Sequence, residues 1–158
     1  MHPTADRFTS RASDELGFDV RVEEFPEGTK TAADAAAAID CDVGQIVKSL
    51  VFVADDDVVV VLTAGDNRVS EERLASELDS DDVRTANPDE VKAATGWSIG
   101  GVPPFLHEER VPVYLDESLL AHDQVWAAAG TPEAVFPLKP DELERLADPT
   151  PVDAFGSA

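Results

Sequence analysis

Two apolar runs on either side of an acidic cluster constrain this chain more than any other feature of its sequence. The first run is QIVKSLVFV at residues 45–53, the second is VVVVLTAGD at residues 58–66, and the triplet DDD lies between them at residues 55–57. Both runs are rich in β-branched side chains, and a short polar turn between two such runs is typical of a β-hairpin. We therefore predict that these residues form a hairpin.

Helices and strands are predicted on both sides of this hairpin. Amphipathic spacing and capping residues predict helices at residues 6–17, after Thr31, after Ser70, after Asn87 and at residues 140–147, with one helical turn at 117–120. Short apolar runs predict strands at residues 19–25, 83–86, 111–116, 124–130 and 134–138, and Pro26 with Gly28 predicts a turn.

These elements follow one another without a regular strand–helix–strand rhythm, which indicates an α+β fold. We expect one domain over residues 1–158, with a mixed, largely antiparallel sheet surrounded by helices. The length of 158 residues suits a single core of this kind. The core should span about residues 18–151, and residues 154–158 should form a short flexible tail.

The charge balance excludes several classes of function. Acidic residues outnumber basic ones by 33 to 12, for a formal net charge of −21, and they are spread between well-patterned apolar segments. A chain with such a pattern folds, and it lacks the basic patch of a protein that binds DNA or RNA broadly. The charge indicates adaptation to a salt-rich cytoplasm, where dense salt screens self-repulsion. An ordinary acidic protein is the alternative.

The sequence also bears on where the protein works. No apolar run approaches the roughly 20 residues that span a bilayer, so we expect no membrane association. The N-terminal segment has neither the basic nor the apolar region of a secretory signal. The single cysteine, Cys41, excludes an intrachain disulfide, which fits a cytoplasmic protein.

Lys48 is the most unusual residue of the hairpin. It is one of only four lysines in the chain, and it lies inside one of the most hydrophobic runs. An ammonium group is costly to bury without a partner, so Lys48 should reach a cleft, a carboxylate or an anionic ligand. A lysine that extends its charged end to the sheet edge is the structural alternative.

The loop Gly100-Gly101-Val102-Pro103-Pro104 is the second feature that could carry chemistry. Paired glycines permit close backbone approach, and paired prolines fix the stretch that follows. Such a loop can present backbone N–H groups to an oxyanion or a ribose without adding charge. It lacks the spacing of a phosphate-binding or dinucleotide-binding motif, and a rigid structural turn is the alternative.

Other arrangements are weaker. The histidines His2, His107 and His122 have no ligand spacing with Cys41, so we expect no metal site and no cysteine–histidine pair. His122-Asp123 could tie down a loop, and a catalytic role is the weaker alternative. No serine-hydrolase elbow is present in the sequence.

Several segments together resemble the YbaK/ProX family, the free-standing relatives of the editing domain inserted in bacterial prolyl-tRNA synthetase. They are GQIVKSLVFV (44–53), VVLTAGDNRVSEERLA (60–75), GGVPPF (100–105) and VPVYLDESLLAHDQVWAAAGTPEAVFPL (111–138). The resemblance runs from about residue 18 to residue 151. Relatives often have Gly-His after the loop phenylalanine, whereas this chain has Leu106-His107.

The resemblance implies a deacylase that hydrolyses the ester of a mischarged tRNA, typically tRNA-Pro carrying alanine, cysteine or another small amino acid. Lys48 matches the family's strand lysine and would bind the phosphate or ribose of the terminal adenosine. Gly101 matches the loop glycine whose backbone helps to hold the substrate carbonyl or the attacking water. The neighbouring residues expected to contact substrate are Ser49, Gly100, Val102, Pro103 and His107.

The family uses no metal and no organic cofactor, so none is expected here. The expected partners are the tRNA acceptor end and prolyl-tRNA synthetase, and the chain is expected to be a monomer or a weak homodimer. A non-catalytic module that binds tRNA ends or a synthetase is the alternative function. Hydrolysis of a different small ester or amide is a third.

Overall fold

The computed structural model describes residues 3–25 and 31–157. The helices are α1 (Pro3–Leu16), α2 (Ala32–Ile39), α3 (Glu71–Glu77), α4 (Pro88–Thr95) and α5 (Pro140–Ala147), with short 3₁₀ helices η1 (Val43–Gln45) and η2 (Glu117–Ala121). The strands are β1 (Glu23–Glu24), β2 (Ile46–Ala54), β3 (Asp57–Ala64), β4 (Asn67–Val69), β5 (Val83–Thr85), β6 (Val113–Leu115), β7 (Val125–Ala128), β8 (Ala134–Leu138), β9 (Thr150–Pro151) and β10 (Phe155–Ser157). The turn predicted at Pro26 and Gly28 lies outside the described residues.

The predicted hairpin forms the centre of the sheet and is confirmed. β2 and β3 pair from Val47 with Ala64 to Ala54 with Asp57. Only two residues lie between the strands, and the first of them, Asp55, has a φ of 54°. Positive φ at this position is what a tight two-residue hairpin turn needs, and aspartate tolerates it better than most side chains.

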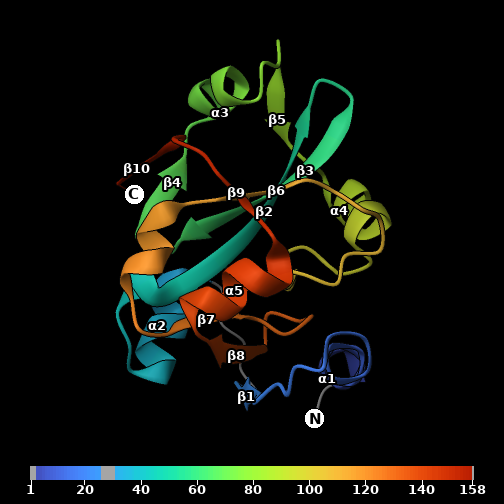
Figure 1. Ribbon diagram of the computed structural model, residues 1–158, viewed down its shortest axis with the longest axis vertical. Coiled ribbons are helices and arrows are strands. Elements are labelled where there is room, and N and C mark those ends of the chain that lie inside the picture. The colour runs from blue at the N-terminus through green and yellow to red at the C-terminus, as the bar shows by residue number, and fades with distance from the viewer. Residues whose placement is uncertain (1–2, 26–30, 158) are drawn as a thin grey trace.

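The fold class is confirmed as a single α+β domain with a mixed sheet. The strand order is β1-β8-β7-β2-β3-β6-β9, and β5 pairs with the same edge of β2 as β7 does. Among the described strands, five pairings are antiparallel and three are parallel. In Figure 1, α1 and α3 lie at opposite ends of the long axis, with the sheet between them.

Alternation along β2 divides the core into two parts. Val47, Val51 and Val53 join the larger cluster, whereas Phe52 and Ala54 face a smaller one. The larger cluster also holds Phe8 from α1, whose ring lies 5.0 Å from that of Phe136 and 5.8 Å from that of Trp97. Helix α1 thus contributes a central aromatic side chain to the core.

Local signals place three helix starts correctly, whereas α1 begins at Pro3, three residues before the predicted start at residue 6. Thr31, Ser70 and Asn87 each accept a hydrogen bond from a backbone N–H in the first turn of the helix that follows. Gly96 ends α4 with a φ of 81°. These caps satisfy backbone groups that a helix leaves unpaired at its ends.

The C-terminal residues differ from the expectation of a flexible tail at residues 154–158. β10 pairs with β4, and Ala154 is fully buried. Ser70 donates its backbone N–H to the Ala154 carbonyl at 2.8 Å, and Arg73 donates to the Phe155 carbonyl at 2.8 Å. The partners come from about eighty residues earlier in the chain, so local composition gives no sign of this pairing.

Within the described residues, no helix is both long enough and apolar enough to cross a lipid bilayer.

Candidate functional site

One edge of β2 is left without a partner strand over its middle. β3 pairs with one edge along the whole hairpin, but on the other edge β7 reaches only Ile46 and Val47, and β5 covers only residues 52–54. Residues 48–51 therefore border a gap in the sheet. An interrupted sheet edge exposes backbone N–H and C=O groups that can bind a ligand.

The main chain of Ser49 faces this gap. The carbonyl of Val51 accepts a hydrogen bond from the N–H of Ala86 at 3.0 Å, so the odd-numbered residues direct their backbone groups to the β5 and β7 side. Because the direction alternates along a strand, Ser49 points its N–H and C=O the same way, between the two partner strands.

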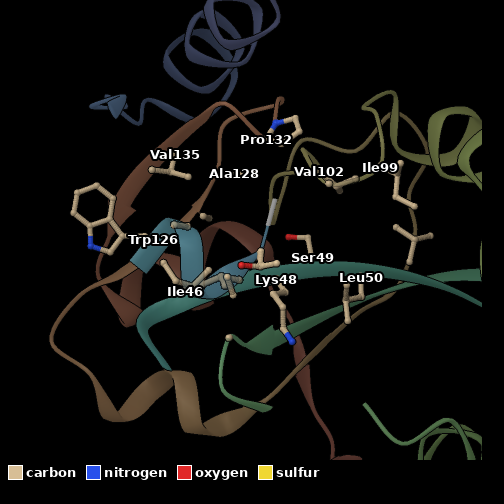
Figure 2. Close-up of a pocket in the computed structure, with 18 of the residues that line it drawn as sticks. Ile46, Lys48, Ser49, Leu50, Ile99, Val102, Trp126, Ala128, Pro132 and Val135 are labelled. Atoms are coloured by element: carbon tan, nitrogen blue, oxygen red, sulfur yellow. The ribbon is translucent and has the colours of Figure 1, made fainter. Parts of the chain in front are cut away.

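A cavity of about 790 Å³ lies at the gap. It is bordered by the middle of β2, the start of α2, the loop after α4, and the β7–β8 region. Its walls are mostly apolar. Residues that Figure 2 labels in this lining are Ile46, Lys48, Ser49, Leu50, Ile99, Val102, Trp126, Ala128, Pro132 and Val135.

Ser49 directs its hydroxyl into this cavity. In Figure 2 its side chain lies on the same side of β2 as Val102 and Ile99. Its Oγ is buried and has no hydrogen-bond partner among the residues described by the structure. Leaving a buried hydroxyl unpaired costs about 1–3 kcal/mol, so this group is available for a ligand.

Lys48 points to the opposite side of β2 (Figure 2). Its Nζ donates to the carbonyl of Asn67 at 2.7 Å, and the side chain is partly buried. Burial lowers the pKa of Lys48, although Asp66 and Asp116 nearby act in the opposite direction. An ammonium group has three donors, so Lys48 keeps further N–H groups for an anionic or hydroxyl ligand.

The buried carboxylate of Asp116 positions Asn67, whose backbone carbonyl accepts the hydrogen bond from Lys48. Asp116 is 3% exposed and accepts hydrogen bonds from the Ala64 N–H at 3.1 Å and from Asn67 Nδ2 at 2.9 Å. Its other oxygen accepts from the Ser118 hydroxyl at 2.7 Å. Burial raises the pKa of Asp116, but the hydrogen bonds from Asn67, Ser118 and the backbone outweigh burial, and the net pKa is below its usual value.

The Gly-Gly loop forms one wall of the cavity through Gly100 and Val102. Gly100 has a φ of 86°, in the region that favours glycine. Gly101 lies behind this wall, packed on Thr131, and a Cβ there would lie 2.6 Å from the Thr131 Cα. The N–H of Gly101 donates to the Ser98 carbonyl at 3.0 Å, so it closes a turn in the loop.

Pro103 and His107 do not line the cavity. His107 donates from Nε2 to the Pro103 carbonyl at 2.8 Å, and this contact ties the two ends of the loop together. Burial lowers the pKa of His107. Leu106 has a φ of 64° and accepts a hydrogen bond from Trp97 Nε1 on its carbonyl. Leu106 therefore helps to hold the loop and does not line the cavity.

The structure thus brings four of the residues singled out from the sequence to the cavity lining: Lys48, Ser49, Gly100 and Val102. Sequence reasoning missed Asn67 and Asp116, because their link to Lys48 depends on long-range packing. It also missed Ile99, which is 55% exposed at the cavity and is the one large hydrophobic side chain so exposed among the described residues. The sequence signal that could have found it is a large apolar residue directly before the glycine pair of a predicted loop.

Within residues 3–25 and 31–157, no three His, Cys, Asp or Glu side chains gather into a group that could hold a metal ion. Cys41 is partly buried beside α2, and burial raises the pKa of its thiol, with Asp42 and Asp40 adding to the effect.

Comparison with known proteins gives consistent matches. The profile of the aminoacyl-tRNA editing domain family matches residues 26–146. A proline–tRNA ligase of Lactobacillus acidophilus is 34% identical over 135 residues, which cover 81% of this chain and 24% of the ligase. This chain therefore spans about a quarter of that enzyme's length. The uncharacterised protein YwhH of Bacillus subtilis is 33% identical over 126 residues, covering 79% of this chain and 80% of YwhH.

Solved structures share the whole fold. The crystal structure of a protein proposed to be a trans-editing enzyme for prolyl-tRNA synthetase superposes with a TM-score of 0.92 at 39% identity, over 99% of both chains. The hypothetical protein APE2540 superposes with a TM-score of 0.83 at 26% identity, over 94% of this chain and 99% of the other.

Proposed function

Because this chain belongs to the aminoacyl-tRNA editing domain family, we propose that it is a trans-editing deacylase. It hydrolyses the ester between a wrong amino acid and the terminal adenosine of a tRNA. The observation that carries this proposal is the unpartnered hydroxyl of Ser49, buried in a cavity that interrupts the sheet beside Lys48. Such a protein would act in the cytoplasm, where charged tRNA is found.

The reaction does not require the protein to supply a strong nucleophile. Water attacks the ester carbonyl carbon, the bond from that carbon to the ribose oxygen breaks, and the ribose oxygen takes a proton. An aminoacyl ester is already activated, so positioning and stabilisation of the developing oxyanion are sufficient, and one donor to such an oxyanion is worth roughly 3–4 kcal/mol. The hydroxyl and the backbone N–H of Ser49 are the donors that best fit this role.

Lys48 and the loop hold the substrate around this centre. Lys48 binds the phosphate or ribose of the terminal adenosine with the N–H groups that Asn67 leaves free. Gly100 and Val102 form the facing wall, and the close packing of Gly101 on Thr131 sets the position of that wall. In this proposal Gly101 acts through packing, since its own N–H is bound within the loop.

Small amino acids are the proposed substrates. The cavity walls are mainly apolar, which suits an amino acid with a small uncharged side chain, and a second sieve would act by excluding larger ones. The relatives named proline–tRNA ligase and the proposed trans-editing enzyme support tRNA-Pro carrying alanine or cysteine as the first substrates to test. Prolyl-tRNA synthetase is the corresponding proposed partner.

A non-catalytic module that binds tRNA ends is the second candidate. One observation favours it: the Gly101 N–H, expected to assist at the substrate carbonyl, is bound to Ser98. Both functions require the protein to bind the tRNA end, so only hydrolysis of the ester distinguishes them.

Deacylation of alanyl-, cysteinyl- and seryl-tRNA-Pro in high KCl tests the proposal. We expect the wild type to hydrolyse one of these esters, and Lys48→Ala to lose at least tenfold in rate. Lys92→Ala is the matched control, because Lys92 is exposed on α4 and does not line the cavity. Folded wild-type protein that binds charged tRNA but leaves all three esters at the buffer rate would favour the binding module.

A further inference from the structure

A second hollow lies next to the cavity and is called here the second groove. Its volume is about 750 Å³. It is lined by residues of β2, β4, β5 and β10 and by the start of α3. Lys48, Leu50, Phe52 and Thr85 line both spaces, so the cavity and the second groove meet along β2, from its unpaired middle to the start of its pairing with β5.

The second groove brings three basic side chains together on a strongly acidic protein. Lys48, Arg68 and Arg73 line it, and these are three of the 12 basic residues in a chain with 33 acidic ones. Glu71 and Glu72 are its acidic lining residues. Among the lining side chains the basic ones therefore outnumber the acidic ones by three to two, whereas the chain as a whole carries a charge of −21.

The three cations are not equally free. Arg73 donates to the Phe155 carbonyl at 2.8 Å and forms an ion pair with Asp153, so it is tied to the C-terminal residues. Lys48 is bound to the Asn67 carbonyl through one of its donors. Arg68 is exposed, and it forms no ion pair within the described part of the chain. Its guanidinium is thus the group most available to an external anion.

The backbone around Arg68 is well held. Arg68 is the central residue of β4 and lies opposite Gly156 of β10. β10 in turn is fixed by Arg73. A cation on a paired strand presents its charge in a defined place, and less order is lost when it binds a ligand.

We propose that the second groove binds the phosphodiester backbone of the single-stranded nucleotides that precede the terminal adenosine, with Arg68 as the main phosphate contact. This inference rests on the proposed function. The esterified adenosine would occupy the cavity, Lys48 would lie where the two spaces meet, and the preceding phosphates would follow the second groove. A short cationic track is the kind of contact with nucleic acid that a chain of this charge can make.

The test compares Arg68→Ala and Arg68→Glu with Arg145→Glu. Arg145 is exposed on α5, lines neither space and serves as the matched arginine control. The first readout is binding of a fluorescent single-stranded RNA that ends in CCA, measured by anisotropy over a range of KCl concentrations. Arg68→Ala should weaken binding and lower the slope of log K against log salt by about 0.7, and Arg68→Glu should weaken binding further.

The second readout is hydrolysis of two substrates with the same amino acid. On aminoacyl-tRNA, Arg68→Glu should raise KM several-fold, and the increase should exceed any change on aminoacyl-adenosine, which has no preceding phosphates. Equal effects on both substrates, or an RNA affinity and salt slope equal to those of the wild type, would overturn the inference.

The two proposals can fail separately. If the wild type binds the RNA through Arg68 but hydrolyses no ester, the second groove is supported and the deacylase is not. If the wild type hydrolyses an ester and the Arg68 variants match Arg145→Glu in both readouts, the deacylase proposal is supported and the proposal for the second groove is overturned.

Discussion

Lys48 and Ser49 are adjacent in β2, but their side chains leave the strand on opposite sides. The Lys48 amine reaches the Asn67 carbonyl at 2.7 Å, whereas the Ser49 hydroxyl is buried in the cavity without a partner. This follows from the alternation of side chains along a strand. One strand therefore supplies a cation to one side of the sheet gap and a neutral donor to the other, and the two contributions can be tested one at a time.

Ser49→Ala should lower activity without lowering stability. Removing a buried hydroxyl that has no partner should leave the free energy of unfolding unchanged or raise it by up to about 1 kcal/mol. Hydrolysis should fall by about 100-fold if this hydroxyl stabilises the oxyanion. Urea unfolding and deacylation rates measure the two effects.

Thr63→Val is the control for Ser49→Ala. Thr63 is fully buried on β3, its hydroxyl also lacks a partner among the described residues, and it does not line the cavity. We expect the same small gain in stability with no loss of hydrolysis. Equal loss of activity in both variants would show that Ser49 has no specific role.

Gly101→Ala tests whether loop packing sets the cavity wall. A Cβ at Gly101 would lie 2.6 Å from the Thr131 Cα and 2.8 Å from its backbone nitrogen, so the backbone must shift. Overpacking of this kind costs about 1–3 kcal/mol, and displacement of the wall should lower kcat/KM as well. In Gly156→Ala, the control for stability, a Cβ meets no atom within 4 Å. Gly101→Ala with wild-type stability and wild-type hydrolysis would contradict the proposed role.

The parts of the molecule that could be predicted and those that could not differ in how far apart along the chain the interacting residues lie. The hairpin and the caps at Thr31, Ser70 and Asn87 depend on neighbouring residues, so the sequence was sufficient. The gap beside Ser49 depends on where β5 and β7 end against β2, and β7 begins about eighty residues later. No local pattern encodes that distance.

The same difference explains the site residues. Lys48 was found because a charge in an apolar run is visible locally. The Asn67 carbonyl that binds it is a backbone atom, and no residue preference marks it. Likewise the engagement of the Gly101 N–H by Ser98 is a property of the turn geometry. The glycine pair predicted a special loop correctly and could not say which of its backbone groups would be free.

Asp116→Asn should lower stability at neutral pH and reduce its dependence on pH in the acid range. The pKa of Asp116 is below its usual value in the folded protein, so its contribution is present above about pH 4 and is lost as the pH falls through the folded pKa. The amide keeps only one acceptor oxygen, so its NH2 would face either the Ala64 N–H and Asn67 Nδ2 or the Ser118 N–H, at a cost on the order of 2 kcal/mol. Thermal melts from pH 7 to pH 3 should show the two proteins converging at low pH. A constant difference across that range would contradict this assignment.

Ile99→Ala should weaken substrate binding and leave the fold intact. Ile99 is 55% exposed and lines the cavity, so its removal costs little packing in the free protein, and stability should stay within about 0.5 kcal/mol. The KM for the aminoacyl-tRNA should rise, and Ile99→Leu should restore most of the binding because it keeps the apolar area. A KM equal to that of the wild type in Ile99→Ala would remove Ile99 from the site.

Stability should rise with salt concentration. The chain has 33 acidic and 12 basic residues, and only three side-chain ion pairs form in the part of the chain that is described. Most carboxylates therefore repel one another with no close cation. The Debye length falls from about 10 Å at 0.1 M salt to about 3 Å at 1 M, so KCl should remove most of this repulsion. Each kcal/mol gained should raise the Tm by about 3 °C.

A charge-reduced variant separates screening from other effects of salt. Asp19→Asn, Asp56→Asn and Glu144→Gln together remove three exposed charges from sites for which no ion pair is found within residues 3–25 and 31–157. This variant should melt at a higher temperature than the wild type in 0.1 M KCl and should gain less from added salt, because less repulsion is left to screen. If KCl raises the Tm of both proteins equally, it acts by strengthening the burial of apolar groups. A Tm that is constant across the range would show that the acidic surface of this chain is not an adaptation to salt.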